Sequence, residues 1–141
     1  MKVATIEDKQ DILDLGMEFF NSIDYGRYAS EEYVSVFLDG FLSSPKDICI
    51  AVYEPKKGMI LGQASAFPFG PHVLASEIAW YVSPDSRKSS LGKELIDAFE
   101  YWAKNIAGCT MITLSGLDDS IGKFYEKQGY KLYEYAYMKE L

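Results

Sequence analysis

Residues 80–96 limit what this chain can fold into more than any other stretch. Strand-forming residues run up to Val82, a turn follows, and a short loop of small and basic residues then opens an amphipathic helix. The first turn of a helix has backbone N–H groups without intrahelical partners, so phosphate groups bind there readily. Arg87, Lys88 and Lys93 add positive charge at this point of an otherwise acidic chain. The stretch therefore predicts a strand–loop–helix unit with an anion-binding loop.

Hydrophobic periodicity divides the chain into elements in the order β-α-α-β-β-β-α-β-α-β. The predicted strands cover residues 3–6, 48–53, 59–67, 75–82, 110–114 and 130–138. The predicted helices cover residues 8–20, the stretch that Ser30 caps and Pro45 ends, the stretch from Leu91 that Gly108 ends, and a short stretch capped by Asp119 or Ser120. We expect an α+β (α/β mixed) fold in a single domain over residues 1–141, with a central, mostly antiparallel mixed sheet flanked by helices.

Composition narrows the function classes. A net charge of -7 argues against a nucleic-acid partner and suits cationic ligands such as amines. No apolar run reaches the length of a membrane span and no signal-peptide pattern is present, so we expect no membrane partner and a cytoplasmic location. Cys49 and Cys109 lie in apolar runs and are expected to be reduced, buried thiols. With His72 as the only histidine, no metal site is expected.

Three short motifs point to one family. Residues 87–92 match the pattern R-x-x-G-x-G/A, with Ser90 where the first glycine is usual. Residues 82–87 are similar to V-x-P-x-x-R, and residues 121–130 are similar to A-x-x-F-Y-E-K-x-G-F. With these motifs the chain resembles the GNAT superfamily of acyl-CoA N-acyltransferases over nearly its whole length. The resemblance implies the GNAT fold, with the sheet splayed at the strand carrying residues 77–82.

The resemblance also implies acetyl-CoA as cosubstrate. Its pyrophosphate would lie on the backbone N–H groups and basic side chains of the loop, and its pantetheine arm along the preceding strand. An ordinary capped surface helix is the simpler alternative. The predicted cofactor-binding residues are Tyr81, Val82, Arg87, Lys88, Ser89, Ser90, Leu91, Gly92, Lys93 and Asp118. Asp118 holds the position where the family often has an asparagine that binds the pantetheine arm.

Tyr125 is the predicted general acid. In the family, the tyrosine of this motif lies beside the sulfur of CoA and protonates the departing thiolate. A phenol suits that step, because its pKa of about 10 keeps it protonated at neutral pH. We expect Phe124 to fill the core and leave Tyr125 facing the cleft. The alternative is a core tyrosine.

Glu77 is the predicted general base, in the middle of the strand that leads to the loop. Strand alternation would place Glu77, Ala79 and Tyr81 on one face. A carboxylate near the thioester could take the proton from an ammonium substrate. A solvated carboxylate, or one paired to a lysine, is an equal alternative. His72 is a second candidate base.

Two further segments carry weaker signals. Residues 24–28 mix acidic and aromatic side chains where relatives shape the acceptor pocket, which would suit a cation. Tyr133, Tyr135 and Tyr137 would share one face of the last predicted strand, packed on a helix or on a second copy in a homodimer.

We expect an N-acetyltransferase that moves an acetyl group from acetyl-CoA to a primary amine by direct attack, with no covalent enzyme intermediate. The acceptor would be a small molecule or a protein amine (a lysine or the N-terminus), and the acidic charge disfavours tRNA. The alternative is a weakly active or inactive GNAT-fold protein that binds CoA and serves a regulatory role. Two features leave this alternative open: Ser90 stands where the loop motif usually has a glycine, and the general base is not identified.

Overall fold

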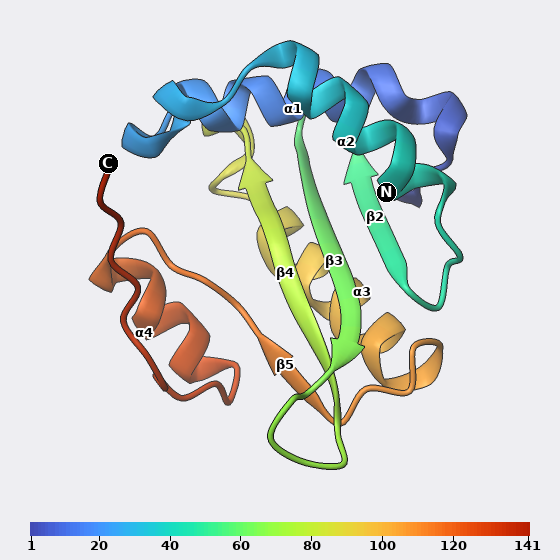
Figure 1. Ribbon diagram of the computed structural model, residues 1–141. Helices are drawn as coiled ribbons and strands as arrows, with labels where there is room; N and C mark the ends of the chain where they lie inside the picture. The colour runs from blue at the N-terminus through green and yellow to red at the C-terminus, as the bar shows by residue number, and fades with distance from the viewer.

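The computed structural model describes residues 1–141 and is built on a five-stranded sheet (Figure 1). In spatial order the strands are β1 (Lys2–Val3), β2 (Cys49–Glu54), β3 (Gly58–Ala66), β4 (Val73–Val82) and β5 (Met111–Thr113). Neighbouring strands are antiparallel except β4 and β5, which are parallel. The predicted mixed, mostly antiparallel sheet is therefore confirmed.

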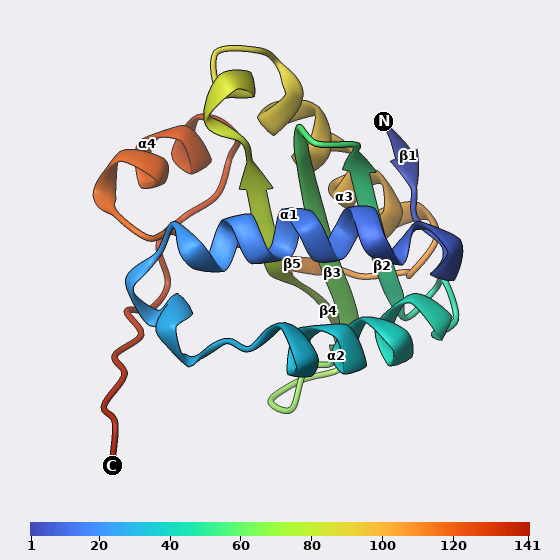
Figure 2. The same ribbon diagram turned by 90° about the horizontal axis from the view of Figure 1, so that it is seen from above.

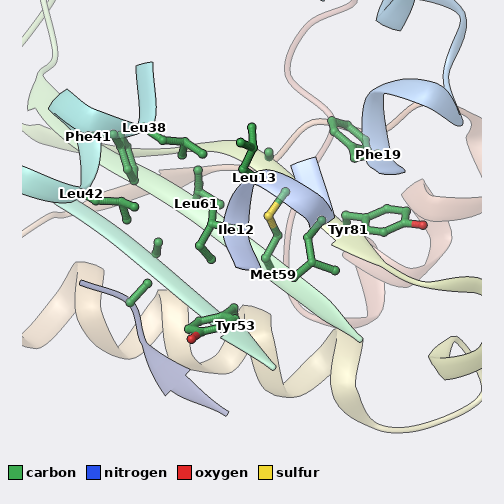
Figure 3. Close-up of a cluster of buried hydrophobic side chains, with 14 of the residues drawn as sticks. Ile12, Leu13, Phe19, Leu38, Phe41, Leu42, Tyr53, Met59, Leu61 and Tyr81 are labelled. Atoms are coloured by element: carbon green, nitrogen blue, oxygen red, sulfur yellow. The ribbon is translucent and has the colours of Figure 1, made fainter. Parts of the chain in front are cut away.

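Helices cover both faces of the sheet (Figures 1 and 2). The helices are α1 (Lys9–Asn21), α2 (Glu31–Ser43), α3 (Leu91–Asn105) and α4 (Asp119–Lys127). Side chains of α1 and α2 form one buried cluster with the sheet, and Figure 3 shows Ile12 of α1, Leu38 of α2 and Met59 of β3 within it. Side chains of α3 and α4 form a second cluster on the opposite face. Alternate residues of β2 enter the two clusters, so this strand is buried on both faces.

Short signals in the sequence set the ends of the helices. Ser30 accepts a hydrogen bond from Tyr33 N at 3.2 Å and caps α2, as predicted. Gly108 follows α3 with φ 66°, a backbone conformation that favours glycine. The cap of α4 is Asp118, whose carboxylate accepts from the N–H groups of Ser120 and Ile121. The prediction that Asp119 or Ser120 caps this helix is wrong by one or two residues.

The predicted strand over residues 130–138 is absent. After Tyr130 no residue takes part in a backbone–backbone hydrogen bond. Tyr133, Tyr135 and Tyr137 are exposed, at 70%, 71% and 92% of their surface. The alternating pattern reports a preference for extended backbone, but a strand also needs a neighbouring strand to pair with, and pattern alone does not supply it. The packing of these tyrosines on a helix is therefore wrong, and the homodimer stays a prediction.

A β-bulge in β4 changes which residues share a face. Ala79 pairs with Leu61 and Glu77 pairs with Gly62, so Ile78 is an extra residue in β4. Ala75 therefore lies in the α3 cluster while Ala79 and Tyr81 lie in the α1–α2 cluster. The predicted common face of Glu77, Ala79 and Tyr81 is wrong, because one extra residue inverts the alternation.

Beyond the bulge the sheet splays. The pairing of β4 with β5 covers only Leu74, Ser76 and the residue between them. Residues 77–82 of β4 therefore have no strand on their β5 side, as predicted for the strand that leads to the loop. The polar backbone groups along this side are available to a ligand. No helix of the chain has both the length and the apolar character needed to cross a membrane.

Candidate active site

A cleft of about 780 Å³ opens where the sheet splays, between the end of β4 and residues 115–125. Nine of the twelve predicted site residues line it: Glu77, Tyr81, Val82, Arg87, Ser89, Gly92, Lys93, Asp118 and Tyr125. Lys88 and Ser90 lie in the adjoining loop without lining the cleft, and the side chain of Leu91 packs in the α3 cluster. The fold therefore gathers residues that are far apart in the sequence around one cavity.

The loop before α3 and the first turn of this helix offer free hydrogen-bond donors. The backbone N–H groups of Lys88, Ser90, Gly92 and Lys93 have no partner in the protein. The indole N–H of Trp80, on the cleft wall, is buried and also has no partner. Such clustered donors at a helix N-terminus bind an anion. The residues present therefore fit a pyrophosphate group.

Gly92 lets α3 approach β4 closely. A Cβ atom at this position would lie 3.2 Å from the ring of Trp80. The glycine of the predicted loop motif therefore serves the contact between helix and strand, which brings the free N–H groups to the cleft edge.

The charged side chains of the loop are partly engaged. Nε of Arg87 donates to the carbonyl of Val82 at 3.0 Å, which occupies one backbone group predicted for the pantetheine arm. The guanidinium carbon also lies 6.0 Å from the centre of the Tyr81 ring, on the cleft wall. Lys93 forms an ion pair with Asp97 at 2.6 Å.

The hydroxyl of Ser90 donates to Oε1 of Glu94 at 2.9 Å and holds a carboxylate beside the loop. The sequence prediction missed Glu94, although it lies four residues after Ser90, one helical turn away.

Glu77 lies half-buried at the start of the splay. Its Oε2 accepts a hydrogen bond from the backbone N–H of Ser115 at 3.0 Å. Burial raises the pKa of Glu77 to about 7, against the opposing effect of that hydrogen bond. Glu77 forms no ion pair with a lysine. The carboxyl group can therefore exchange a proton near neutral pH.

Tyr125 is buried on α4, and its hydroxyl donates to the carbonyl of Ser115 at 2.7 Å. Burial, followed by the charge of Glu77, raises the pKa of Tyr125 well above its usual range. The ring contacts those of Trp80, Phe124 and Tyr130. Phe124 is half-buried, whereas Tyr125 is buried. The expectation that Phe124 fills the core in place of Tyr125 is therefore wrong. Tyr125 both packs in the core and lines the cleft.

Ser115 connects the two candidate catalytic side chains. Its backbone N–H donates to Glu77 and its backbone C=O accepts from Tyr125. A single residue in the segment after β5 therefore positions both side chains. The sequence prediction did not include Ser115, because backbone groups carry no residue-type signal. Its position directly after a predicted strand was the available clue.

His72 lies elsewhere. Its Nδ1 is 3.1 Å from the hydroxyl of Thr110, it is exposed, and it does not line the cleft. The alternative of His72 as the base therefore has no support in the geometry. Cys49 is buried, Cys109 is half-buried, and both are free thiols. No group of three or more His, Cys, Asp or Glu side chains could hold a metal ion.

Comparison with known proteins shows to which family the chain belongs. The acetyltransferase (GNAT) family profile matches residues 10–130. An aminoglycoside N(6')-acetyltransferase type 1 of Klebsiella aerogenes is 30% identical over 81 residues, which are 55% of this chain and 53% of that protein. The aligned segment thus spans about half the length of this relative.

Solved structures share the fold at low sequence identity. The aminoglycoside acetyltransferase AAC(6')-Iy, in complex with the bisubstrate analogue CoA-S-monomethyl-acetylneamine, has a TM-score of 0.77 at 13% identity over 99% of this chain and 95% of that chain. A ribosomal-protein-alanine N-acetyltransferase from Brucella melitensis has a TM-score of 0.71 at 14% identity over 99% and 98% of the two chains. These two similarities concern the fold alone, whereas the family profile covers most of the sequence. The chain belongs to the acetyltransferase (GNAT) family.

Proposed function

We propose that this protein transfers the acetyl group of acetyl-CoA to a primary amine. One observation carries the proposal: a single cleft joins Gly92 and Lys93, whose backbone N–H groups are free at the start of α3, to Glu77 and Tyr125. The first part suits the pyrophosphate of acetyl-CoA, and the second suits acid–base chemistry. The unpaired side of β4 between them suits the pantetheine arm.

The proposed reaction assigns one proton transfer to each side chain. Glu77 accepts a proton from the ammonium group of the acceptor, directly or through water. The neutral amine nitrogen attacks the carbonyl carbon of the thioester, a C–N bond forms and the C–S bond breaks. The departing sulfur takes the hydroxyl proton of Tyr125, which must first leave the carbonyl of Ser115. The attacking nitrogen then loses its second proton to the phenolate of Tyr125, which leaves a neutral amide and restores the phenol. The proton on Glu77 passes to solvent.

The acceptor is proposed to be a small amine. The Klebsiella relative acts on aminoglycosides by its name, and the acidic charge of this chain attracts cations. An amine of a protein, as in the Brucella relative by its name, is the second candidate acceptor.

A second function follows from the hydrogen bond of Tyr125. Because its proton is engaged by Ser115, the protein could bind CoA without turning it over efficiently. One experiment separates the two functions: release of free thiol from acetyl-CoA is followed with a panel of amines, aminosugars and lysine peptides. Amine-dependent release supports transfer. Tight acetyl-CoA binding with no release above background, for every acceptor, supports the CoA-binding protein instead.

A further inference from the structure

A second cavity of about 620 Å³ adjoins the cleft on the acceptor side. Its walls are the short 3-10 helix η2 (Asp24–Tyr28), the loop before α4, and the end of the C-terminal tail. Tyr25, Leu117 and Asp118 line both cavities, so the two are continuous. A molecule whose reacting amine lies at Glu77 can therefore extend into the second cavity.

The tail forms the outer wall of this cavity. In Figure 1 the tail passes α4 and ends near the segment that follows α1. The hydroxyl of Tyr28 donates to Oε2 of Glu140 at 3.0 Å and joins the two segments, which lie 112 positions apart. Met138 lies on the same wall. The tail makes no backbone hydrogen bonds after Tyr130, so side-chain contacts such as this one join its end to the rest of the protein.

The charges around the cavity favour a cation. Asp24, Asp118 and Glu140 line it together with one positive side chain, Arg27. Arg27 is already paired with Asp24 at 2.9 Å and donates to the hydroxyl of Tyr28 at 3.0 Å. Asp118 and Glu140 therefore form no ion pair, although Asp118 also caps α4. The ring of Tyr25 lies beside these carboxylates, whereas the guanidinium group of Arg27 already lies over the ring of Tyr28, 4.7 Å from its centre. Carboxylates and aromatic faces together bind ammonium groups.

We propose that this cavity holds a second ammonium group of the acceptor, and that Glu140 selects acceptors that carry one. The preferred substrates are then diamines, polyamines and aminosugars with several amino groups, and monoamines are poor substrates. This inference rests on the proposed function, since it places the reacting amine of the same molecule at Glu77. Glu140 is a specificity-determining residue in this arrangement and takes no part in the proton transfers.

The test compares two acceptors that differ by one ammonium group. For the unaltered protein, kcat/KM for diaminohexane should exceed that for hexylamine about tenfold or more. Glu140→Gln should reduce this preference at least about threefold and leave the KM for acetyl-CoA unchanged. Tyr28→Phe, which releases Glu140, should reduce it by a smaller factor. Neamine in place of diaminohexane shows whether aminosugars use the same cavity.

A matched control removes the same charge from the same tail. Glu134 is exposed and does not line the cavity, so Glu134→Gln should keep the preference for the diamine. Equal kcat/KM for the two amines, or equal losses in the Glu140 and Glu134 variants, would overturn the inference. If no amine is acetylated, the proposed function fails, and calorimetric titration of the CoA-bound protein with both amines decides the inference. Tighter binding of diaminohexane that Glu140→Gln abolishes supports it, and equal or absent binding of both amines rejects it.

Discussion

Glu77 and Tyr125 bind the same residue, Ser115, yet their surroundings give their protons different behaviour. Burial raises the pKa of Glu77 to about 7, so both of its forms are populated near neutral pH. Burial and the nearby carboxylate raise the pKa of Tyr125 above its usual range, so the phenol keeps its proton. Their environments thus let Glu77 accept a proton and keep a proton on Tyr125 for donation. Such a pair of titratable groups suits acid–base catalysis.

Replacing Tyr125 by Phe should lower kcat about 10²- to 10⁴-fold, because it removes the proton donor and keeps the ring. The KM for acetyl-CoA should change little. Steady-state kinetics with a saturating amine measure the effect. Tyr130→Phe is the matched control, since it removes a half-buried hydroxyl that donates to Glu100 at 2.6 Å and does not line the cleft. Unchanged kcat for Tyr125→Phe, where chemistry limits the rate, would remove Tyr125 from the mechanism.

Replacing Glu77 by Gln should change how stability depends on pH. The folded protein raises the pKa of Glu77 from 4.5 to about 7, so between these values it binds more protons than the unfolded chain. This carboxyl group therefore lowers the stability progressively as pH rises from 4.5 to 7. Glu77→Gln removes the effect, and its melting temperature relative to the unaltered protein should be several degrees higher at pH 8 than at pH 5. The exposed Glu126→Gln should show no such difference, and a parallel pH profile for Glu77→Gln would contradict the raised pKa.

At the scale of elements, the strand–loop–helix unit of residues 80–96 was predictable because its signals are local. The free N–H groups, the basic residues and the apolar stripe of α3 all lie within one stretch of sequence. The carboxylate of Glu94, held by Ser90 beside the loop, opposes an incoming anion at the same position.

Glu94→Gln should therefore tighten CoA binding, by a few-fold at low salt, since charges near a helix N-terminus contribute about 0.3–1 kcal/mol. Ser90→Gly should preserve or strengthen binding as well, because it releases Glu94 and restores the glycine that the motif usually has. Calorimetric titration with CoA measures both. Asp47→Asn is the control: Asp47 is exposed and follows Lys46, whose carbonyl accepts a hydrogen bond from Trp102 of α3, and it does not line the cleft, so the affinity should stay unchanged. Weaker binding by Glu94→Gln would show that the carboxylate supports the loop.

Long-range features were the part that sequence could not supply. The bulge at Ile78 depends on how β4 meets β3, and it decides the face on which Glu77 lies. The tyrosines of residues 133–137 alternate as in a strand, but no strand pairs with them. The backbone of Ser115 carries no residue-type signal at all. Periodicity reports which residues prefer extended backbone, whereas pairing and register are properties of the assembled sheet.

At the scale of the whole molecule, the cleft separates the end of β4 from the segment that leads into α4. Few contacts of the sheet cross this gap, since β4 and β5 pair at only three positions. A ligand that contacts both sides would therefore connect parts of the molecule that the sheet leaves apart. Binding to the folded state alone stabilises it by mass action.

Acetyl-CoA should accordingly raise the melting temperature. At a ligand concentration about 100 times the Kd the stabilisation is about 2.7 kcal/mol. For a chain of this length that corresponds to a rise on the order of 10 °C. Arg87→Ala should reduce the rise, because it removes the positive guanidinium group at the cleft edge. Lys104→Ala, an exposed cation in the last turn of α3, is the matched control and should keep the full rise. The thermal melt is recorded with CoA and acetyl-CoA in parallel, and the absence of a shift with both at millimolar concentration would reject acetyl-CoA as the cosubstrate.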